Sequence, residues 1–187
     1  MRRQRRFPVP RRIVLVRSAT ILILCGLAVW QHFTAHDPRP VPQPGTTLLV
    51  TRVIDGDTLL LEDQSRVRLI GANAPEVKHP DAPAQPFADA ATQFTRQHVE
   101  GVPVRLEFDK ERRDKYGRTL AYVYVEDWLL NEELIRAGFA TAMTKYPYSE
   151  SMKRRFRDAQ AIAQRERRGL WSTTPPASRT AAPPGRR

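Results

Sequence analysis

Hydrophobic and polar positions alternate in short runs through the middle of the chain, a pattern typical of β-strands with one buried face. Five runs are predicted to be strands, and a short sixth run follows them. They cover residues 47–54, 58–62, 66–72, 102–108 and 118–125, with 128–130 as the sixth. The Asp55-Gly56-Asp57 segment is a turn signal, so the first two strands are expected to form a hairpin.

Helical periodicity separates some of these strands. Residues 86–99 and 149–168 repeat apolar positions at helical spacing, and Gly169 is expected to end the second helix. A shorter helix over 131–137 is expected to start with Asn131 as its polar cap and to stop at Gly138. Five strands with about three helices predict an α+β domain, built on a small, partly open, five-stranded OB-fold β-barrel.

A different pattern precedes this domain. Residues 13–30 read IVLVRSATILILCGLAVW, an apolar run interrupted by Arg17. A helix of this length spans about 27 Å, close to the roughly 30 Å of a bilayer core, so residues 13–32 are predicted to be a transmembrane helix. The arginine-rich start predicts a single-pass protein with a cytoplasmic N-terminus and a periplasmic or extracellular domain. Secretion after signal cleavage, at a site such as Gly26-Leu27-Ala28, is the alternative.

Composition then divides the chain into five parts. A basic cytoplasmic N-terminus (1–12) precedes the anchor (13–32), and a proline-rich linker (33–45) leads to the globular domain (46–172) and a disordered tail (173–187). The formal net charge of +11 belongs mostly to the ends, because residues 1–45 hold eight arginines and one aspartate, and 173–187 hold three arginines and no acid. The domain itself is therefore nearly neutral, and bulk basicity gives no argument for a nucleic-acid partner.

The only cysteine, Cys25, lies in the apolar run, so the domain has none. Disulfides, a thiol nucleophile and a thiolate metal site are thereby excluded from the domain. Chemistry there depends on oxygen and nitrogen side chains.

Four residues of the domain offer such chemistry. Asp57 ends the hairpin turn, Arg68 lies in the third strand on the same face as Arg66, Glu76 follows a proline in a loop, and Arg118 starts a strand. Each has an ordinary structural reading alone: a turn residue, a solvated strand face, a loop acid and a turn-flanking cation. Together they supply what phosphodiester cleavage requires, namely an oxygen ligand for a hard cation, a base for water and cations for the phosphoryl oxygens.

The same residues lie within a longer series of motifs, in order: VIDGDT (53–58), RLIGANAPEVKHP (68–80), DKYGR (114–118), LAYVY (120–124), NEELIRAGFA (131–140) and GLW (169–171). This series resembles the staphylococcal nuclease (thermonuclease) family throughout 46–172. The resemblance implies an OB-fold barrel, a bound calcium ion and hydrolysis of DNA and RNA strands.

Carried over position by position, the resemblance implies that Asp57 binds calcium together with the backbone carbonyl of Ala74. Arg68 and Arg118 would grip the substrate phosphate, and Glu76 would be the general base acting on the attacking water. Asn73 stands where the family has a second metal-binding aspartate. An amide oxygen coordinates a hard cation without supplying charge, so a weakened calcium site, or another divalent ion, is expected.

Tyr116, Tyr146 and Tyr148 are candidates for contact with the nucleotide, because stacking on a base tolerates any sequence. Tyr146 and Tyr148 fall where the family has tyrosines beside the nucleotide. The alternative is that loop aromatics simply pack on the barrel.

Three functions remain open at this point. The first is a membrane-anchored, exported nuclease with a divalent metal. The second is a non-catalytic nucleic-acid-binding OB-fold module anchored to the membrane, in which Glu76 would have no purpose. The third, a tethered adaptor for proteins, explains none of the four central residues.

Overall fold

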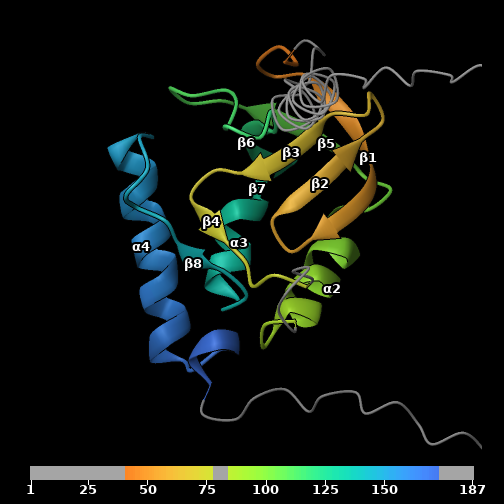
Figure 1. Ribbon diagram of the computed structural model, residues 1–187. Helices are drawn as coiled ribbons and strands as arrows, with labels where there is room; N and C mark the ends of the chain where they lie inside the picture. Colours follow the sequence, from red (N-terminus) through yellow and green to blue (C-terminus); the bar gives the residue numbers. More distant parts are fainter. Residues whose placement is uncertain (1–40, 78–83, 173–187) are drawn as a thin grey trace, which may run out of the picture. The chain divides into compact units, whose positions relative to one another are not determined.

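In the computed structural model, which describes residues 41–77 and 84–172, the main sheet curls into a barrel (Figure 1). Five of its six strands form the closed ring, and β7 adds to one edge beside β6. The main sheet has the order β3-β2-β1-β5-β6-β7, and an additional pairing of β3 with β6 closes it. Its strands are β1 (Thr47–Asp55), β2 (Thr58–Leu61), β3 (Arg66–Leu69), β5 (Pro103–Glu107), β6 (Thr119–Val125) and β7 (Trp128–Leu129). Neighbours pair antiparallel except at the closure, where β3 and β6 run parallel. The expected five-stranded OB-type barrel is confirmed.

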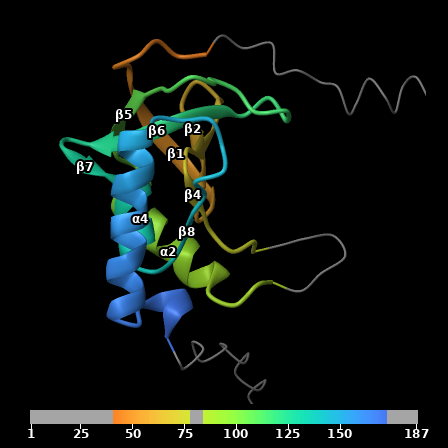
Figure 2. The ribbon, with the colours of Figure 1, turned by 90° about the vertical axis from the view of Figure 1, so that its left-hand side faces the viewer.

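Three helices and a second small sheet surround the barrel. The helices are α2 (Ala88–Val99), α3 (Leu130–Arg136) and α4 (Glu150–Arg165), and a 3-10 turn follows at Gly169–Trp171. In Figures 1 and 2, α4 runs along one flank of the molecule, whereas α2 lies below the β1–β2 end. The small sheet pairs β4 (Ala72–Asn73) with β8 (Thr141–Ala142). The α+β class and the three helices agree with the sequence.

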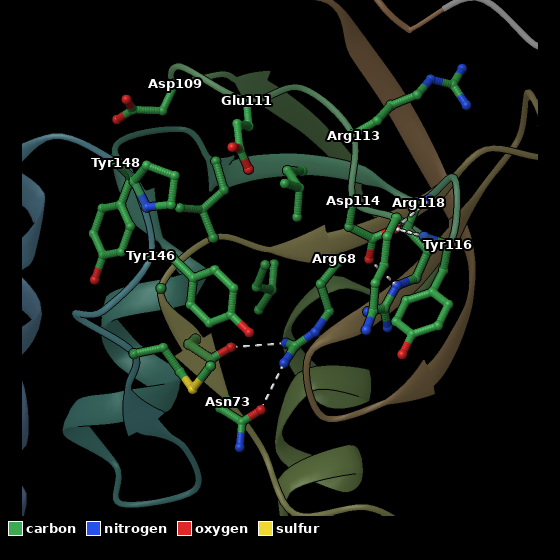
Figure 3. Close-up of a pocket in the computed structure, with 18 of the residues that line it drawn as sticks. Arg68, Asn73, Asp109, Glu111, Arg113, Asp114, Tyr116, Arg118, Tyr146 and Tyr148 are labelled. Atoms are coloured by element: carbon green, nitrogen blue, oxygen red, sulfur yellow. Dashed lines mark hydrogen bonds and ion pairs between the residues drawn. The ribbon is translucent and has the colours of Figure 1, made fainter. Parts of the chain in front are cut away.

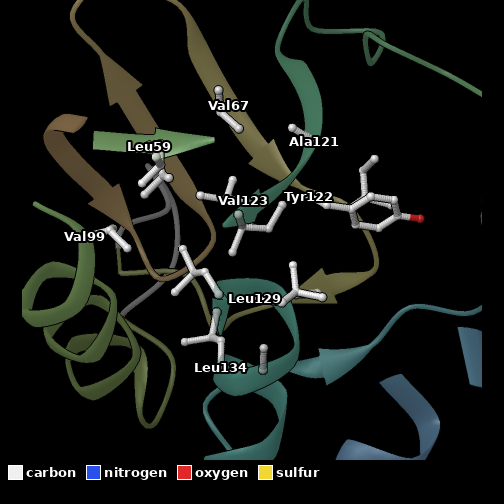
Figure 4. Packing of buried hydrophobic residues seen from close by; sticks show 14 of the residues in the cluster. Leu59, Val67, Val99, Ala121, Tyr122, Val123, Leu129 and Leu134 are labelled. Atoms are coloured by element: carbon white, nitrogen blue, oxygen red, sulfur yellow. The ribbon is translucent and has the colours of Figure 1, made fainter. Parts of the chain in front are cut away.

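The barrel core follows directly from the strand alternation. Leu59 pairs with Val53 on one side and with Val67 on the other, and all three side chains are at most 1% exposed. Val99 of α2 and Leu134 of α3 close this core from the helical side (Figure 4). Each such side chain stabilises the fold by about 1.5–3 kcal/mol when it leaves water.

Asn131 was expected to cap the helix over 131–137, and this expectation is wrong. The α3 helix begins at Leu130, and the Asn131 amide is fully buried. Its oxygen accepts a hydrogen bond from the Val123 N–H at 3.0 Å, and its nitrogen donates to the carbonyls of Ile70 at 2.9 Å and Ala121 at 3.2 Å. The amide therefore satisfies backbone groups at the junction of β3 and β6, where leaving them unpaired would be costly.

The single strand expected over 66–72 is also wrong in detail. The β3 strand ends at Leu69, Gly71 adopts a positive φ of 74°, and β4 then starts in a different sheet. Similarly, the last helix ends at Arg165 and not at residue 168. The break after β3 turns the chain away from the barrel and towards the site described below.

Several predicted segments lie outside the described residues. These are the basic N-terminus (1–12), the apolar segment (13–32), most of the linker (33–45) and the tail (173–187). Within residues 41–77 and 84–172, no helix is both long enough and apolar enough to cross a bilayer.

Candidate active site

The turn that carries Asp57 is fixed by its own side chains. Asp55 and Thr58 pair across the hairpin, leaving Gly56 and Asp57 at its tip. The Asp55 carboxylate accepts a hydrogen bond from the Asp57 N–H at 3.0 Å. Asp55 thus shapes the turn, a local role that aspartate commonly has.

Gly56 fits this turn against α2. A Cβ atom at this position would lie 2.7 Å from the Cβ of Ala74 and 2.8 Å from the Cβ of Ala91. The Thr95 hydroxyl donates to the Gly56 carbonyl at 2.7 Å. Only glycine permits so close an approach, which holds Asp57 at a defined depth beside the barrel.

The Asp57 carboxylate is buried, with 5% of the residue exposed. Its Oδ2 accepts a hydrogen bond from the Ala74 N–H at 2.6 Å and lies 2.5 Å from Nη1 of Arg68, while Oδ1 accepts from the Thr58 hydroxyl at 3.2 Å. Burial raises the pKa of Asp57 to about 7, against the lowering influence of Arg68. Loss of water around the carboxylate thus disfavours its ionised form more than the contacts with Arg68 and the Ala74 N–H favour it.

Arg68 binds three oxygens from its place on β3. Besides Asp57, it donates from Nη1 to the Ala72 carbonyl at 2.8 Å and from Nη2 to Oδ1 of Asn73 at 2.9 Å. Two of these acceptors belong to β4, so the break after β3 brings β4 onto the guanidinium. The contacts fix a planar cation at the wall of a cleft.

Glu76 follows β4 in a loop. Its backbone is tied to Gln85 at both polar groups, because the Glu76 N–H donates to the Gln85 side-chain oxygen at 3.2 Å and the Gln85 N–H donates to the Glu76 carbonyl at 3.0 Å. Its side chain is exposed, lines the same cleft and has no hydrogen-bond or ion-pair partner among the residues that the structure describes. A solvated carboxylate with a fixed backbone suits the role of a base.

Arg118 is oriented by Asp114 across a tight turn. Its Nε donates to Oδ2 of Asp114 at 2.7 Å, and Oδ1 of the same carboxylate accepts from the N–H groups of Arg118 and Tyr116, both at 2.9 Å. The guanidinium lies 5.5 Å from the centre of the Tyr116 ring. Because Asp114 engages Nε, the two terminal nitrogens are left to bind a phosphate bidentately.

Figure 3 shows Arg68, Asn73 and Arg118 together with the three tyrosines around one hollow, a cleft of about 540 Å³. The structure brings seven predicted residues together in its lining: Arg68, Asn73, Glu76, Tyr116, Arg118, Tyr146 and Tyr148. Asp57 and Ala74 are not in the lining, and Asp57 lies behind Arg68 in direct contact with it. Among the predicted residues, the cleft thus brings together two arginines and the Glu76 carboxylate.

The three tyrosines differ in exposure. Tyr116 and Tyr146 are 68% and 58% exposed, as expected for aromatic rings that could stack on a base. Tyr148 is only 3% exposed, packs against Phe156, and has a buried hydroxyl without a hydrogen-bond partner in the described part of the chain. For Tyr148 the packing alternative is thus the better description, and burial raises its pKa to about 12.

The loop that carries Tyr146 and Tyr148 is fastened to the barrel by Asp109. Its Oδ2 accepts hydrogen bonds from the Tyr122 hydroxyl at 2.7 Å and from the Ser149 N–H at 2.9 Å, at the start of α4. Burial acts to raise the pKa of Asp109, but these hydrogen bonds outweigh it, so the pKa is lowered. The carboxylate is therefore most stabilising when ionised.

The oxygen atoms proposed as metal ligands are of a kind that suits a hard divalent cation. Within residues 41–77 and 84–172, no group of three or more acidic, histidine or cysteine side chains converges on one point. A cation here would have to use the Asp57 carboxylate, the Asn73 amide oxygen and the Ala74 carbonyl, all of which are oxygens of the kind calcium prefers. The raised pKa of the buried Asp57 is what an added positive charge would relieve.

Three supporting residues were not found from the sequence: Asp114, Gln85 and Asp109. The spacing of Asp114 before Tyr-Gly-Arg was the one available signal, since an aspartate often bonds to backbone N–H groups just after it. Gln85 bonds to Glu76, and Asp109 bonds to Tyr122 and Ser149. These partners lie too far away in the sequence to produce a local motif. Lys78, His79 and Asp81 lie outside the described residues.

Fold and site together define an OB-fold protein with an arginine-lined cleft beside a buried carboxylate. Residues 66–173 match the family described as staphylococcal nuclease homologue. The chain is 38% identical over 164 residues to the thermonuclease of Staphylococcus intermedius, covering 84% of this chain and 95% of that protein. It is 41% identical over 132 residues to the thermonuclease of Staphylococcus hyicus, covering 67% and 76% of the two chains. The chain is also 35% identical over 125 residues to an endonuclease of Bacillus subtilis (strain 168). That alignment covers 65% of this chain and 59% of the endonuclease. The chain belongs to the family of staphylococcal nuclease homologues, so the predicted resemblance is confirmed.

Proposed function

We propose that this protein is a nuclease that hydrolyses phosphodiester bonds of DNA or RNA with the help of a divalent cation, most simply calcium. Family membership and relatives named thermonuclease and endonuclease support the enzyme class. The observation that carries the residue roles is the convergence of Arg68, Arg118 and Glu76 on one cleft. Two guanidinium groups held in place, with a carboxylate that has no partner among residues 41–77 and 84–172, match the needs of water attack on a phosphodiester.

The geometry of each group supports the role proposed for it. Arg68 and Arg118 bind the scissile phosphate and offset the negative charge that grows on its oxygens in the transition state. Glu76 accepts a proton from the attacking water, whose oxygen bonds to phosphorus as the bond from phosphorus to the leaving oxygen breaks. Asp114 is a positioning residue, because it touches only Arg118 and its turn.

Asp57, Asn73 and the Ala74 carbonyl would hold the divalent cation. When bound, such an ion stabilises charge on phosphoryl oxygens and lowers the pKa of water. Asn73 supplies an oxygen without a charge, so weaker binding than at a site with two carboxylates is expected. Tyr116 and Tyr146, exposed at the cleft, would contact the nucleotide.

The decisive experiment compares cleavage of single-stranded DNA by the full-length protein and by Glu76→Gln, with calcium and with chelator. Loss of a general base should lower kcat by about 10²–10⁴-fold while binding persists. Glu111→Gln is the matched control, because this exposed carboxylate lines the same cleft. Binding without cleavage by the wild-type protein, with or without calcium, would favour the non-catalytic module instead.

We also propose that the protein is exported and held at the membrane by residues 13–32. The support is the order of the segments in the sequence, with arginines before an apolar run and a proline-rich linker behind it. Cell fractionation with added protease tests this. A domain that protease digests neither in intact cells nor in spheroplasts, but only after the inner membrane is broken, would contradict export. A soluble form shortened at its N-terminus would indicate cleavage and secretion.

A further inference from the structure

A second, smaller hollow of about 310 Å³ lies on the outer face of the barrel. Its lining comes from the first three strands and the β2–β3 turn, which lie side by side in Figure 1. We name it the outer-face patch, formed by Arg52, Ile54, Leu60, Gln64 and Arg66. None of these residues has a role in the chemistry proposed above.

The strand register places two arginines of the patch in one row. Arg52 of β1 lies opposite Leu60 of β2, and Leu60 lies opposite Arg66 of β3. Residues directly opposite one another share a face of the sheet, and adjacent strands are about 4.8 Å apart. The two guanidinium groups therefore flank an apolar side chain, with backbone attachments roughly 10 Å apart.

Both arginines are exposed, and neither forms an ion pair with a residue that the structure describes. By contrast, Arg68 and Arg118 each contact a carboxylate. Ile54 of the patch is 39% exposed, and the only other exposed large hydrophobic residues in the described ranges are Tyr116 and Tyr146, both in the cleft. Unpaired cations beside exposed apolar surface suit a ligand with phosphates and flat rings.

The patch adjoins the cleft along β3. Arg66 and Arg68 are two residues apart on the same face of this strand, which separates their Cα atoms by about 6.7 Å. Arg68 lines the cleft, whereas Arg66 lines the patch. A strand of nucleic acid that leaves Arg68 across the outer face of β3 would therefore meet Arg66 and then Arg52.

From this continuity we infer that the outer-face patch is an accessory binding site for the phosphate backbone of single-stranded nucleic acid outside the scissile bond. The inference rests on the proposed nuclease function and extends it to substrate length. Arg52 and Arg66 contact phosphates, while Ile54 and Leu60 lie against sugars or bases. Long strands are thus bound more tightly than short ones, and this advantage weakens as salt rises.

The test uses the full-length protein and two single-stranded DNA substrates, a dinucleotide and a strand of about 12 nucleotides, within the length that one OB fold binds. The variant Arg52→Gln/Arg66→Gln is compared with Arg154→Gln/Arg165→Gln, which removes two exposed charges from α4. KM is measured between about 50 and 200 mM salt. Thermal unfolding checks both pairs, and the single variant Arg66→Gln replaces the first if it is unstable.

Removal of the patch arginines should raise KM several-fold more for the long strand than for the dinucleotide. The slope of log KM against log salt should fall by about 0.7 for each lost phosphate contact. Arg52→Lys/Arg66→Lys should largely keep the slope, and the α4 control should change little. Equal KM values for the long strand in wild type and in the glutamine variant would overturn the inference.

Failure of the proposed function gives a different result, because the wild-type protein would then cut neither substrate. In that case the affinity for the long strand, measured by fluorescence anisotropy with chelator present, tests the patch alone. Vesicles containing phosphatidylserine provide the last comparison. If the glutamine variant lost vesicle binding but kept its DNA affinity, the patch would be a membrane contact and the inference would be wrong.

Discussion

Nη1 of Arg68 lies 2.5 Å from Oδ2 of Asp57, so the proposed phosphate-binding cation and the proposed metal-binding carboxylate are in direct contact. The same guanidinium donates to the Asn73 amide oxygen at 2.9 Å. Two of the oxygens assigned to the divalent cation thus already face a positive charge. A cation on these oxygens competes electrostatically with Arg68.

This competition predicts that Arg68→Gln binds calcium several-fold more tightly than the wild-type protein, although it loses cleavage. Isothermal titration calorimetry without substrate measures the affinity. Arg66→Gln is the matched control, because it removes the same charge from the same strand without touching Asp57. Unchanged or weaker calcium binding by Arg68→Gln would contradict the assignment of these oxygens to the cation.

Arg118→Lys should lower kcat/KM on the order of 100-fold, although the positive charge remains. Lysine cannot bind a phosphate bidentately, nor can it reproduce the Nε contact by which Asp114 orients the guanidinium. Steady-state kinetics on single-stranded DNA measures the loss, with the exposed Arg112→Lys in the same loop as control. A variant that cuts at the wild-type rate would remove Arg118 from the site.

Asn73→Asp should lower the calcium concentration needed for half-maximal cleavage several-fold. The new carboxylate keeps the acceptor that Arg68 uses and adds a negative charge beside Asp57. A calcium titration of cleavage measures the change, and Asp57→Asn/Asn73→Asp shows whether the gain depends on the first carboxylate. The same half-maximal concentration in wild type and Asn73→Asp would mean that residue 73 is not a ligand.

The strands and helices were predictable because each follows from a local period, and Leu59 with Val53 and Val67 shows how alternation becomes a core. The features that local patterns do not predict are those that depend on residues distant in the sequence. Asn131 looks like a helix cap in the sequence, yet its amide is buried against backbone of two other strands. β4 likewise exists only because Thr141–Ala142 lies beside it.

The site likewise has residues that local motifs predict and residues whose roles depend on distant contacts. The motifs predict roles for Asp57, Arg68 and Arg118, but none for the residues that hold them, although Asp114 lies in the same DKYGR motif as Arg118. Asp114 looks like one more loop acid until its two oxygens are seen on Arg118 and the turn. Nor does the sequence reveal that Asp57 is buried and in contact with Arg68, since burial arises from the packing of α2 and β4 around the hairpin.

That packing predicts a cost for Gly56→Ala. The added Cβ would lie 2.7 Å from the Ala74 Cβ and 2.8 Å from the Ala91 Cβ, so the turn must move away from α2. We expect a loss of about 1–3 kcal/mol in the free energy of unfolding, together with reduced cleavage because Asp57 shifts. Gly101→Ala is the comparison, because open space surrounds that position and only its φ of 77° causes strain. Full activity in Gly56→Ala would show that the turn is not held in this way.

Asp109→Asn should make stability less dependent on pH at the acid end. The lowered pKa of Asp109 means that the folded protein favours the ionised form. Its contribution is therefore present above the unfolded value of 3.8 and is lost as pH falls through the lower folded value. Asparagine accepts the bonds from Tyr122 and Ser149 without a charge, so we expect a loss of about 1.5 kcal/mol at pH 7, since bonds to a charged acceptor are the stronger kind.

The measurement is denaturant unfolding of wild type and Asp109→Asn at several pH values from 7 down to about 3, a range that spans the titration of a carboxylate. The two unfolding free energies should converge as pH falls below 3.8, because wild type then loses the charge that the variant never had. Asp158→Asn controls for the general effect of removing an exposed acid on α4. If the difference stayed constant at every pH, Asp109 would fasten α4 to the barrel through shape and neutral hydrogen bonds, and its ionised form would contribute nothing further.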